Sequence, residues 1–237
     1  MPDILNQNST FWSKAYYSPN VESYIYRLYG RILKPEFGLP IANPKSKLLD
    51  FGCGQGSAVN FFNSLGFDCW GVDQNPIDIK VSKDRYPHIA DRFSIVPNNT
   101  CEIESFGNLL GATNFDIITA CQVLYYLPKE QFNHFLQLAY SSLNKNGLLF
   151  ATMYSQKDKD FYESSTLVKE SDGWMREINF NSIRKKIANY FIHFVKDEED
   201  LVEKFTNFSP VHIGEYSIKL HEGDTNEHHY TFLGIKQ

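Results

Sequence analysis

The sequence has few cysteines and no surplus of basic residues. Its four cysteines, Cys53, Cys69, Cys101 and Cys121, form no Cys-x-x-Cys pair and lie in or beside apolar segments. We therefore expect reduced thiols in a cytoplasmic protein. The 237 residues carry a net charge of −5 without a concentrated basic run, which disfavours nucleic acid as a partner. No apolar run reaches membrane-spanning length, and the polar N-terminus lacks the form of a signal peptide.

Several catalytic motifs are also missing. There is no Gly-x-Ser-x-Gly elbow of a serine hydrolase and no Walker loop of a nucleoside triphosphatase. Histidines and carboxylates crowd residues 221–229, but His228 and His229 are adjacent, and adjacent residues of a strand point to opposite faces. Both cannot easily reach one ion, so we predict no metal.

The composition is that of a folded globule. Hydrophobic residues make up 42% of the chain and aromatic residues 15%, which is too apolar for a disordered protein. The length fits one large domain, or one domain with an insertion.

The stretch from Lys47 to Asp73 predicts a strand, a glycine turn, a helix and a second strand. A short buried-strand pattern at residues 48–51 is followed by glycines at alternate positions, where a chain turns sharply and exposes backbone N–H groups. Residues 58–65 then have helical spacing. Asp73 ends the second strand 21 residues after Gly52, where a ribose-binding acid sits in nucleotide-binding βαβ units.

The spacing of the glycines narrows the choice of ligand. A dinucleotide fingerprint needs glycine at position 57, which is Ser57 here, and the chain reads Asp50-x-Gly52-x-Gly54-x-Gly56 instead. This run resembles motif I of the class I S-adenosylmethionine-dependent methyltransferases. Residues 72–75, Val-Asp-Gln-Asn, resemble the second motif of that family, and residues 115–128 resemble its fourth.

Beyond Asp73 the pattern continues to alternate. Strands are expected at residues 93–96, 115–122 and 148–153, with helices between them and two further strands at 211–220 and 228–236. We predict an α/β fold: a Rossmann-like, doubly wound, mostly parallel seven-stranded sheet with helices on both faces and an antiparallel terminal hairpin. Residues 1–237 form a single methyltransferase domain in this interpretation. Its parts are an N-terminal helical cap (1–46), a cofactor-binding core (47–153), an insertion or lid (154–196) and a terminal helix with two strands (197–237).

The resemblance implies S-adenosyl-L-methionine as the cofactor. The glycine loop then meets the methionine end, because a helix N-terminus favours an anion such as its carboxylate. Asp73 meets the ribose hydroxyls, while Asn98 or Asn99 meets the adenine side, together with Gln122. Polar turns are the commoner use of such Asn-Asn pairs. The predicted cofactor-binding residues are Asp50, Gly52, Cys53, Gly54, Gly56, Asp73, Gln74, Asn99, Cys121 and Gln122.

The acceptor site is less defined in the sequence. Tyr125, Tyr126, Tyr154 and Tyr17 are the candidates for acceptor contact, with His193, Trp174 and Arg176 of the insertion as secondary candidates. Tyr16, Tyr17 and Arg27 are also candidates for an N-terminal lid, although such aromatic residues equally often pack a helix on a sheet. Many small-molecule methyltransferases have histidines where this chain has Tyr125 and Tyr126, so no catalytic base is identified.

The resulting hypothesis is methyl transfer to an oxygen or nitrogen atom of a small metabolite or sugar-like acceptor. Two alternatives remain: a noncatalytic S-adenosylmethionine-binding or scaffold protein, and an NAD-dependent oxidoreductase. The sequence predicts no membrane association and leaves the oligomeric state open.

Overall fold

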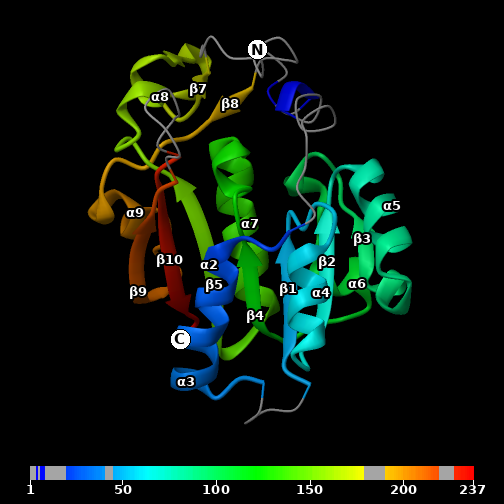
Figure 1. Ribbon diagram of the computed structural model, residues 1–237. Coiled ribbons are helices and arrows are strands. Elements are labelled where there is room, and N and C mark those ends of the chain that lie inside the picture. Colours follow the sequence, from blue (N-terminus) through cyan, green and yellow to red (C-terminus); the bar gives the residue numbers. More distant parts are fainter. Residues whose placement is uncertain (1–3, 5, 9–19, 41–44, 179–189, 219–226) are drawn as a thin grey trace.

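A seven-stranded sheet runs through the centre of the computed structural model, which describes residues 4, 6–8, 20–40, 45–178, 190–218 and 227–237 (Figure 1). The strand order is β3-β2-β1-β4-β5-β10-β9. The first five strands in this order are parallel, while β10 is antiparallel to both β5 and β9. The strands are β1 (Lys47–Phe51), β2 (Asp68–Asp73), β3 (Phe93–Ile95), β4 (Phe115–Ala120), β5 (Leu143–Tyr154), β9 (Ser209–Tyr216) and β10 (His229–Ile235).

Helices cover both faces of this sheet, because successive strand residues point to opposite sides. Leu49 of β1 packs in the cluster that α6, α7 and α9 cover, while its neighbour Leu48 packs in the cluster under α2, α4 and α5. The predicted doubly wound fold with an antiparallel terminal hairpin is confirmed. The helices are α2 (Ser23–Leu28), α4 (Ser57–Ser64), α5 (Pro76–Arg85), α6 (Phe106–Leu110), α7 (Lys129–Ser142) and α9 (Glu198–Lys204).

The strand order reverses between β1 and β4, since β2 lies on one side of β1 and β4 on the other. The carboxyl ends of the parallel strands lie at the top of Figure 1. Ligands of open α/β sheets bind outside this edge at the reversal. The loops after β1 and β4 are therefore the part of the fold that positions a site.

The described residues of the predicted insertion after β5 form short regular elements. They include the helix α8 (Lys159–Glu163) and a small antiparallel sheet in the order β6-β7-β8. The sequence does not reveal this sheet, because strands of two residues are too short to show an alternating pattern. The three strands are β6 (Thr166–Leu167), β7 (Arg176–Glu177) and β8 (Phe191–Ile192).

The predicted helix of the N-terminal cap begins at Ser23 and continues through a π-helical turn, Tyr29–Leu33, into α3 (Lys34–Phe37). Tyr24, Ile25 and Leu28 are buried against the sheet. Tyr16 and Tyr17 lie outside the described residues. Within the described ranges, no helix is both long and apolar enough to cross a lipid bilayer.

Several strand ends differ from the prediction, and two of these differences concern β4 and β5. The fourth strand ends at Ala120 instead of 122, because Gln122 has a φ of +54° and cannot continue the ladder. The fifth strand begins at Leu143 instead of 148, and Leu143 pairs with Phe115. Its Asn-Lys-Asn-Gly run at residues 144–147 has the composition of a turn, which hides the strand in the sequence.

Candidate cofactor and acceptor site

The loop after β1 is a glycine turn in the left-handed region of φ. Gly52, Gly54 and Gly56 have φ values of +75°, +51° and +80°, which glycine adopts without steric cost. A side chain would also lack space. A Cβ on Gly52 would lie 2.6 Å from Val123 Cγ2, and one on Gly56 would lie 2.7 Å from the Phe93 ring. The glycines therefore let this turn pack directly against the loop after β4 and against β3.

Backbone hydrogen bonds fix the glycine turn to the end of β2. The Gly52 and Cys53 N–H groups both donate to the Val72 carbonyl oxygen, at 2.8 and 3.0 Å. The Gly54 N–H donates to Asp73 Oδ2 at 2.9 Å, and Asp73 Oδ1 accepts from the Asn75 N–H at 2.8 Å. The carboxylate predicted to hold a ribose therefore also holds the turn.

Burial raises the pKa of Asp73 to about 6, against the lowering effect of the backbone N–H donors of Asn75, Gly54 and Gln74. Gln74 contacts this carboxylate through its backbone. Asp73 is thus mostly ionised at neutral pH. Its carboxylate has about four acceptor positions and three backbone donors, so one position is left for a hydroxyl donor.

Asp50 faces the interior of the sheet. The residue is 4% exposed, and its carboxylate accepts a 2.7 Å hydrogen bond from Thr119 Oγ1, its partner in the β1–β4 register. Burial raises the pKa of Asp50 to about 7, partly offset by the Thr119 bond. In the described contacts, the Asp50 side chain joins β1 to β4 through Thr119. A contact between Asp50 and a cofactor stays a prediction.

The two asparagines after β3 have different roles. Asn99 Oδ1 accepts from the Cys101 N–H at 3.1 Å and so caps a short 3₁₀ turn, the common structural use of asparagine. Asn98 Nδ2 donates to Asn6 Oδ1 at 3.3 Å, while Asn98 Oδ1 is buried and has no hydrogen-bond donor among the described residues. A buried acceptor without a donor fits the amino group of an adenine.

The loop after β4 begins with Cys121 and Gln122. Cys121 is partly buried, and burial raises the pKa of its thiol well above its ordinary value. The Gln122 N–H donates to Thr152 Oγ1 at 2.7 Å, and its Nε2 donates to Tyr216 Oη at 3.2 Å. The Gln122 side chain, assigned to the adenine side in the sequence, thus points toward the β5–β10–β9 half of the sheet.

The predicted acceptor tyrosines meet at this half of the sheet. The ring centroids of Tyr125 and Tyr126 are 4.5 Å apart, and those of Tyr125 and Tyr154 are 5.5 Å apart. Tyr154 Oη donates to Asp158 Oδ2 at 3.2 Å. Tyr125 and Tyr154 are buried and Tyr126 is half-buried. The structure therefore brings these three together, while Tyr17 lies outside the described residues.

Two further residues of this cluster were missed in the sequence. His229 begins β10 directly opposite Tyr154 of β5 and Tyr216 of β9. Its ring stacks on the Tyr216 ring at 5.0 Å and 6°, and its centroid lies 4.4 Å from that of Tyr154. His229 is 75 residues from Tyr154 and 13 from Tyr216 in the chain, so only the strand register could have revealed the cluster.

The secondary candidates of the insertion make contacts within the protein, and Trp174 joins the insertion to the loop after β4. Trp174 Nε1 donates to the Leu127 carbonyl at 3.0 Å, and the Trp174 ring stacks on His193 at 3.8 Å. Arg176 donates to Ser165 and lies over the Tyr162 ring. The side-chain N–H groups of Trp174 and Arg176 thus donate to other residues of the protein. A contact of either residue with an acceptor stays a prediction.

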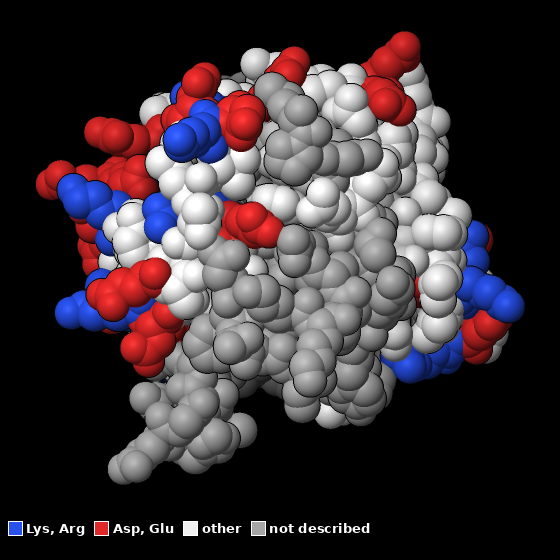
Figure 2. Space-filling view, turned by 90° about the horizontal axis from the view of Figure 1, so that it is seen from above, with Lys and Arg blue, Asp and Glu red and all other residues white. Residues whose placement is uncertain are grey.

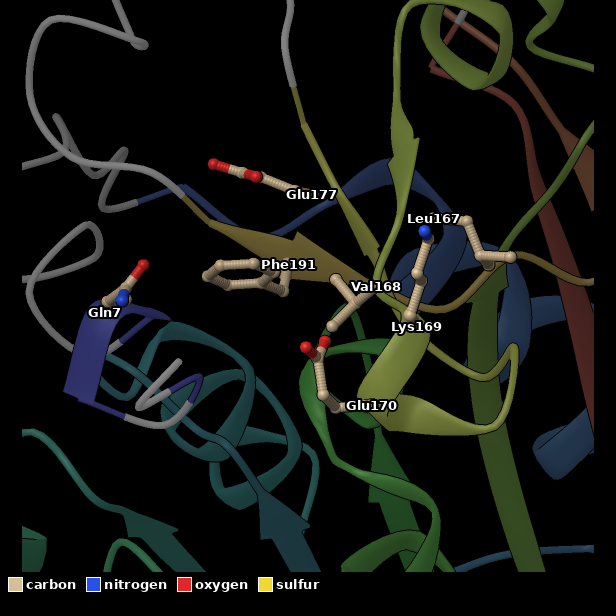
Figure 3. Close-up of a pocket in the computed structure, with 7 residues that line it drawn as sticks. All are labelled: Gln7, Leu167, Val168, Lys169, Glu170, Glu177 and Phe191. Carbon is tan, nitrogen blue, oxygen red and sulfur yellow. The ribbon is translucent and has the colours of Figure 1, made fainter. Parts of the chain in front are cut away.

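A separate hollow of about 440 Å³ lies between Gln7, near the N-terminus, and the small sheet (Figure 3). Figure 3 shows Gln7 facing Phe191 across it. Among the residues that the structure describes, none of the predicted site residues lines this hollow. Its lining residues are Gln7, Leu167, Val168, Lys169, Glu170, Glu177 and Phe191.

Figure 2 shows the molecule from above, the side on which the parallel strands end. Acidic and basic side chains lie beside one another around the rim of this face (Figure 2). Among the residues that the structure describes, no three His, Cys, Asp or Glu side chains are placed to hold a metal ion. The carboxylates Glu222 and Asp224 lie outside that part of the chain.

The family model of a methyltransferase domain matches residues 21–200, which is most of the chain. The chain belongs to this methyltransferase family. The match confirms the resemblance drawn from the glycine motif and the prediction of a methyltransferase that uses S-adenosylmethionine. No curated protein matches the chain.

Solved structures share the fold of this methyltransferase. An S-adenosylmethionine-dependent methyltransferase from Methanosarcina mazei has 14% identity and a TM-score of 0.64, with 92% of this chain and 98% of that chain covered. N-methyltransferase NodS from Bradyrhizobium japonicum, in complex with S-adenosylhomocysteine, has 14% identity and a TM-score of 0.57, with 90% and 84% covered. Magnesium protoporphyrin IX methyltransferase from Synechocystis, also with bound S-adenosylhomocysteine, has 15% identity and a TM-score of 0.55, with 96% and 93% covered.

Proposed function

We propose that this methyltransferase transfers a methyl group to an oxygen or nitrogen atom of a small metabolite. The observation that carries the proposal is the bond between the Gly54 N–H and Asp73 Oδ2, which joins the glycine turn and the carboxylate into one unit at the strand reversal. That unit lies beside the loop of the acceptor tyrosines, because Gly52 packs on Val123.

The residues present fit S-adenosylmethionine. The glycine turn leads into the N-terminus of α4, whose Gly56 cap offers no side chain and so leaves the positive end of the helix to the methionine carboxylate. Asp73 is assigned to the ribose hydroxyls. Asn98 Oδ1, a buried acceptor with no described donor, is assigned to the adenine amino group in preference to Asn99, whose oxygen caps a turn.

When bound, the cofactor supplies an electrophilic methyl group and takes the electron pair of the broken carbon–sulfur bond. The protein then aligns the acceptor and excludes water, and alignment alone is worth about 7–11 kcal/mol in favourable systems. The Tyr125–Tyr126–Tyr154 cluster is assigned to the acceptor, because it presents apolar rings and hydroxyl groups together. Such a lining favours a small organic acceptor over nucleic acid.

Two experiments test the proposal in sequence. Calorimetry with S-adenosylhomocysteine and with NAD separates a methyltransferase from an oxidoreductase. A transfer assay with methyl-labelled S-adenosylmethionine and a panel of small alcohols, phenols, sugars and amines then separates an enzyme from a binding protein. Label in at least one small acceptor supports the proposal. Binding without any transfer, including to a macromolecule panel, supports the scaffold alternative instead. The single-domain organisation, the lid and the cytoplasmic location stay predictions.

A further inference from the structure

His229 is the best-placed proton acceptor that the proposed function does not yet use. It lies 2% exposed at the start of β10, among the rings of Tyr125, Tyr154 and Tyr216. A histidine placed among acceptor-site tyrosines has either a packing role or a role in proton transfer. The hydrogen bonds of its two ring nitrogens distinguish these roles.

The tautomer of His229 follows from its backbone contact. Its Nδ1 lies 2.8 Å from the Glu227 carbonyl oxygen, and a carbonyl only accepts, so Nδ1 carries the proton. Burial lowers the pKa of His229 to about 4, more strongly than the Glu227 bond raises it, and the ring is neutral at neutral pH. The lone pair is therefore on Nε2.

Nε2 faces a single hydroxyl among the described contacts. It lies 3.4 Å from Tyr125 Oη, which is long for a hydrogen bond. Catalytic hydrogen bonds are often long before the substrate binds and shorten in the reacting complex. Burial raises the pKa of Tyr125 well above its ordinary value, so its hydroxyl keeps its proton and points it at Nε2. Tyr125 also hydrogen-bonds with the side chain of Tyr126. A hydroxyl has one proton and two lone pairs, so with the proton toward His229 Nε2 and one lone pair toward Tyr126, one lone pair is left for the methyl acceptor.

The position of this pair relates it to the cofactor site. Tyr125 lies two residues after Val123, which packs on Gly52 of the glycine turn. Tyr216, stacked on His229, accepts a hydrogen bond from Gln122 at the end of β4. Two separate contacts thus link His229 and Tyr125 to the strand ends where the proposed methyl transfer takes place.

We infer that Tyr125 and His229 form a proton relay that takes the proton of the methyl acceptor, which is therefore an alcohol, a phenol or a protonated amine. This inference rests on the proposed function. Tyr125 Oη takes the proton from the acceptor atom as the Tyr125 proton moves to His229 Nε2, and the acceptor lone pair forms the new bond to carbon. Tyr125 ends neutral, and His229 ends as an imidazolium ion.

The charge balance makes this relay physically reasonable in a buried site. An isolated buried charge is unfavourable, and the low pKa of His229 reflects that cost. Methyl transfer removes the positive charge of a sulfonium, so the charge gained by His229 leaves the net charge of the region unchanged. His229 is a weak base before the methyl group moves. It gains its proton as the sulfonium loses its charge in the same reaction.

The first experiment needs no acceptor. Two-bond ¹H–¹⁵N correlation spectra of the full-length protein report the tautomer and protonation of each histidine as pH is varied. We expect His229 to be neutral with its proton on Nδ1 at pH 7, and the Nε2 signal to shift in Tyr125→Phe. A His229 that is cationic at pH 7, or protonated on Nε2, overturns the relay.

The second experiment measures transfer from methyl-labelled S-adenosylmethionine to phenols, aliphatic alcohols and primary amines. His229→Gln and Tyr125→Phe should each lose at least 100-fold in rate with unchanged affinity for S-adenosylhomocysteine, since general-base catalysis contributes about 10²–10⁴-fold. His228→Gln is the matched control, because the adjacent His228 faces Glu215 instead and should keep the rate. Tyr125→Phe removes one hydroxyl only, so it tests the relay even where His229→Gln does not fold.

The pH profile separates proton transfer from packing. The rate of the wild type should fall at acidic pH as His229 becomes protonated, and this limb should disappear in the residual rate of His229→Gln. The groups around His229 that also titrate or carry charge are Tyr125, Tyr154, Tyr216, His228 and, through Tyr154, Asp158 and Glu227. Equal rates and equal pH profiles in the wild type and both variants overturn the relay. A wild type that binds no S-adenosylhomocysteine overturns the proposed function itself.

Discussion

The side chain of Asn8 pairs with the backbone of Phe191 as a peptide group would. Asn8 Oδ1 accepts from the Phe191 N–H at 2.7 Å, and Asn8 Nδ2 donates to the Phe191 carbonyl at 3.0 Å. The same amide lies 3.3 Å from the Tyr126 carbonyl. One residue near the N-terminus thus links the small sheet of the insertion to the loop that carries the acceptor tyrosines.

Asn8→Ala should expose the insertion to proteases. The substitution removes three hydrogen bonds, each contributing about 1 kcal/mol, and leaves buried backbone groups of Phe191 without partners. We expect cleavage within residues 154–196 to become at least several-fold faster in limited proteolysis followed by mass spectrometry. Gln7→Ala is the control and should leave the rate unchanged. Saturating S-adenosylhomocysteine together with an acceptor should slow this cleavage in the wild type; equal cleavage in all states argues against a lid.

Asp73→Ala should weaken cofactor binding. Hydrogen bonds to a charged group contribute about 1.5–3 kcal/mol, so the Kd of S-adenosylhomocysteine should rise at least tenfold in calorimetry. The substitution also releases the Gly54 N–H, which loosens the glycine turn. Asp68→Ala at the opposite end of β2 is the matched control, because Asp68 pairs with Arg92 away from the site. An Asp73 variant that binds with wild-type affinity removes the ribose assignment.

Gly56→Ala should destabilise the fold more than Gly111→Ala. Both glycines have positive φ values, +80° and +63°, so both substitutions incur the left-handed cost of about 1–2 kcal/mol. Only the Cβ at 56 also meets a neighbour, the Phe93 ring at 2.7 Å, and overpacking costs about 1–3 kcal/mol more. Urea unfolding at 25 °C measures the difference. Equal losses would mean that Gly56 is needed for its backbone conformation alone.

Asp50 should make the protein less stable as pH rises. Its pKa is about 7 in the folded state and 3.8 as an ordinary aspartate, so the folded state binds more protons between these values. Stability from this group is fully present below pH 4 and is lost as pH rises through 7, by about 4 kcal/mol at roughly 1.4 kcal/mol per pKa unit.

Asp50→Asn isolates this effect, because it keeps an oxygen acceptor for Thr119 and removes the ionisation. The variant should gain stability relative to the wild type between pH 5 and pH 8, as measured by urea unfolding at both values. Comparison at each pH cancels the contribution of His229, which acts in the opposite direction. It also cancels most of the contribution of Asp73, which acts in the same direction and whose charge helps to raise the pKa of Asp50. If the difference in unfolding free energy between the variant and the wild type does not change with pH, Asp50 is not a buried group that ionises in this range.

The parts of the site that are local in sequence could be predicted from it. The glycine turn and Asp73 lie within 22 residues, and their positions follow from a strand, a turn and a strand whose geometry leaves few choices. The seven-stranded sheet was also predictable, because its helices and strands are long enough to show periodicity. The adenine-side role of Gln122 stays a prediction, and its Nε2 donates to Tyr216 Oη.

The missed parts depend on contacts between distant segments. His229 and Tyr216 join the tyrosine cluster only because β10 lies between β5 and β9 in one particular register. Asn8 acts on Phe191 across 183 residues. Asn98 and Asn99 are neighbours of the same type, and only the packing around them decides that Asn99 caps a turn and Asn98 keeps a buried acceptor. None of these relationships leaves a local pattern.

The most direct test of the account is calorimetric titration of the folded wild-type protein with S-adenosylhomocysteine. The glycine turn and Asp73 should give saturable binding of one molecule per chain, with no heat from NAD at the same concentrations. Pure, folded protein that gives no heat with S-adenosylhomocysteine or with S-adenosylmethionine contradicts the assignment of residues 52–56 and Asp73 to one cofactor.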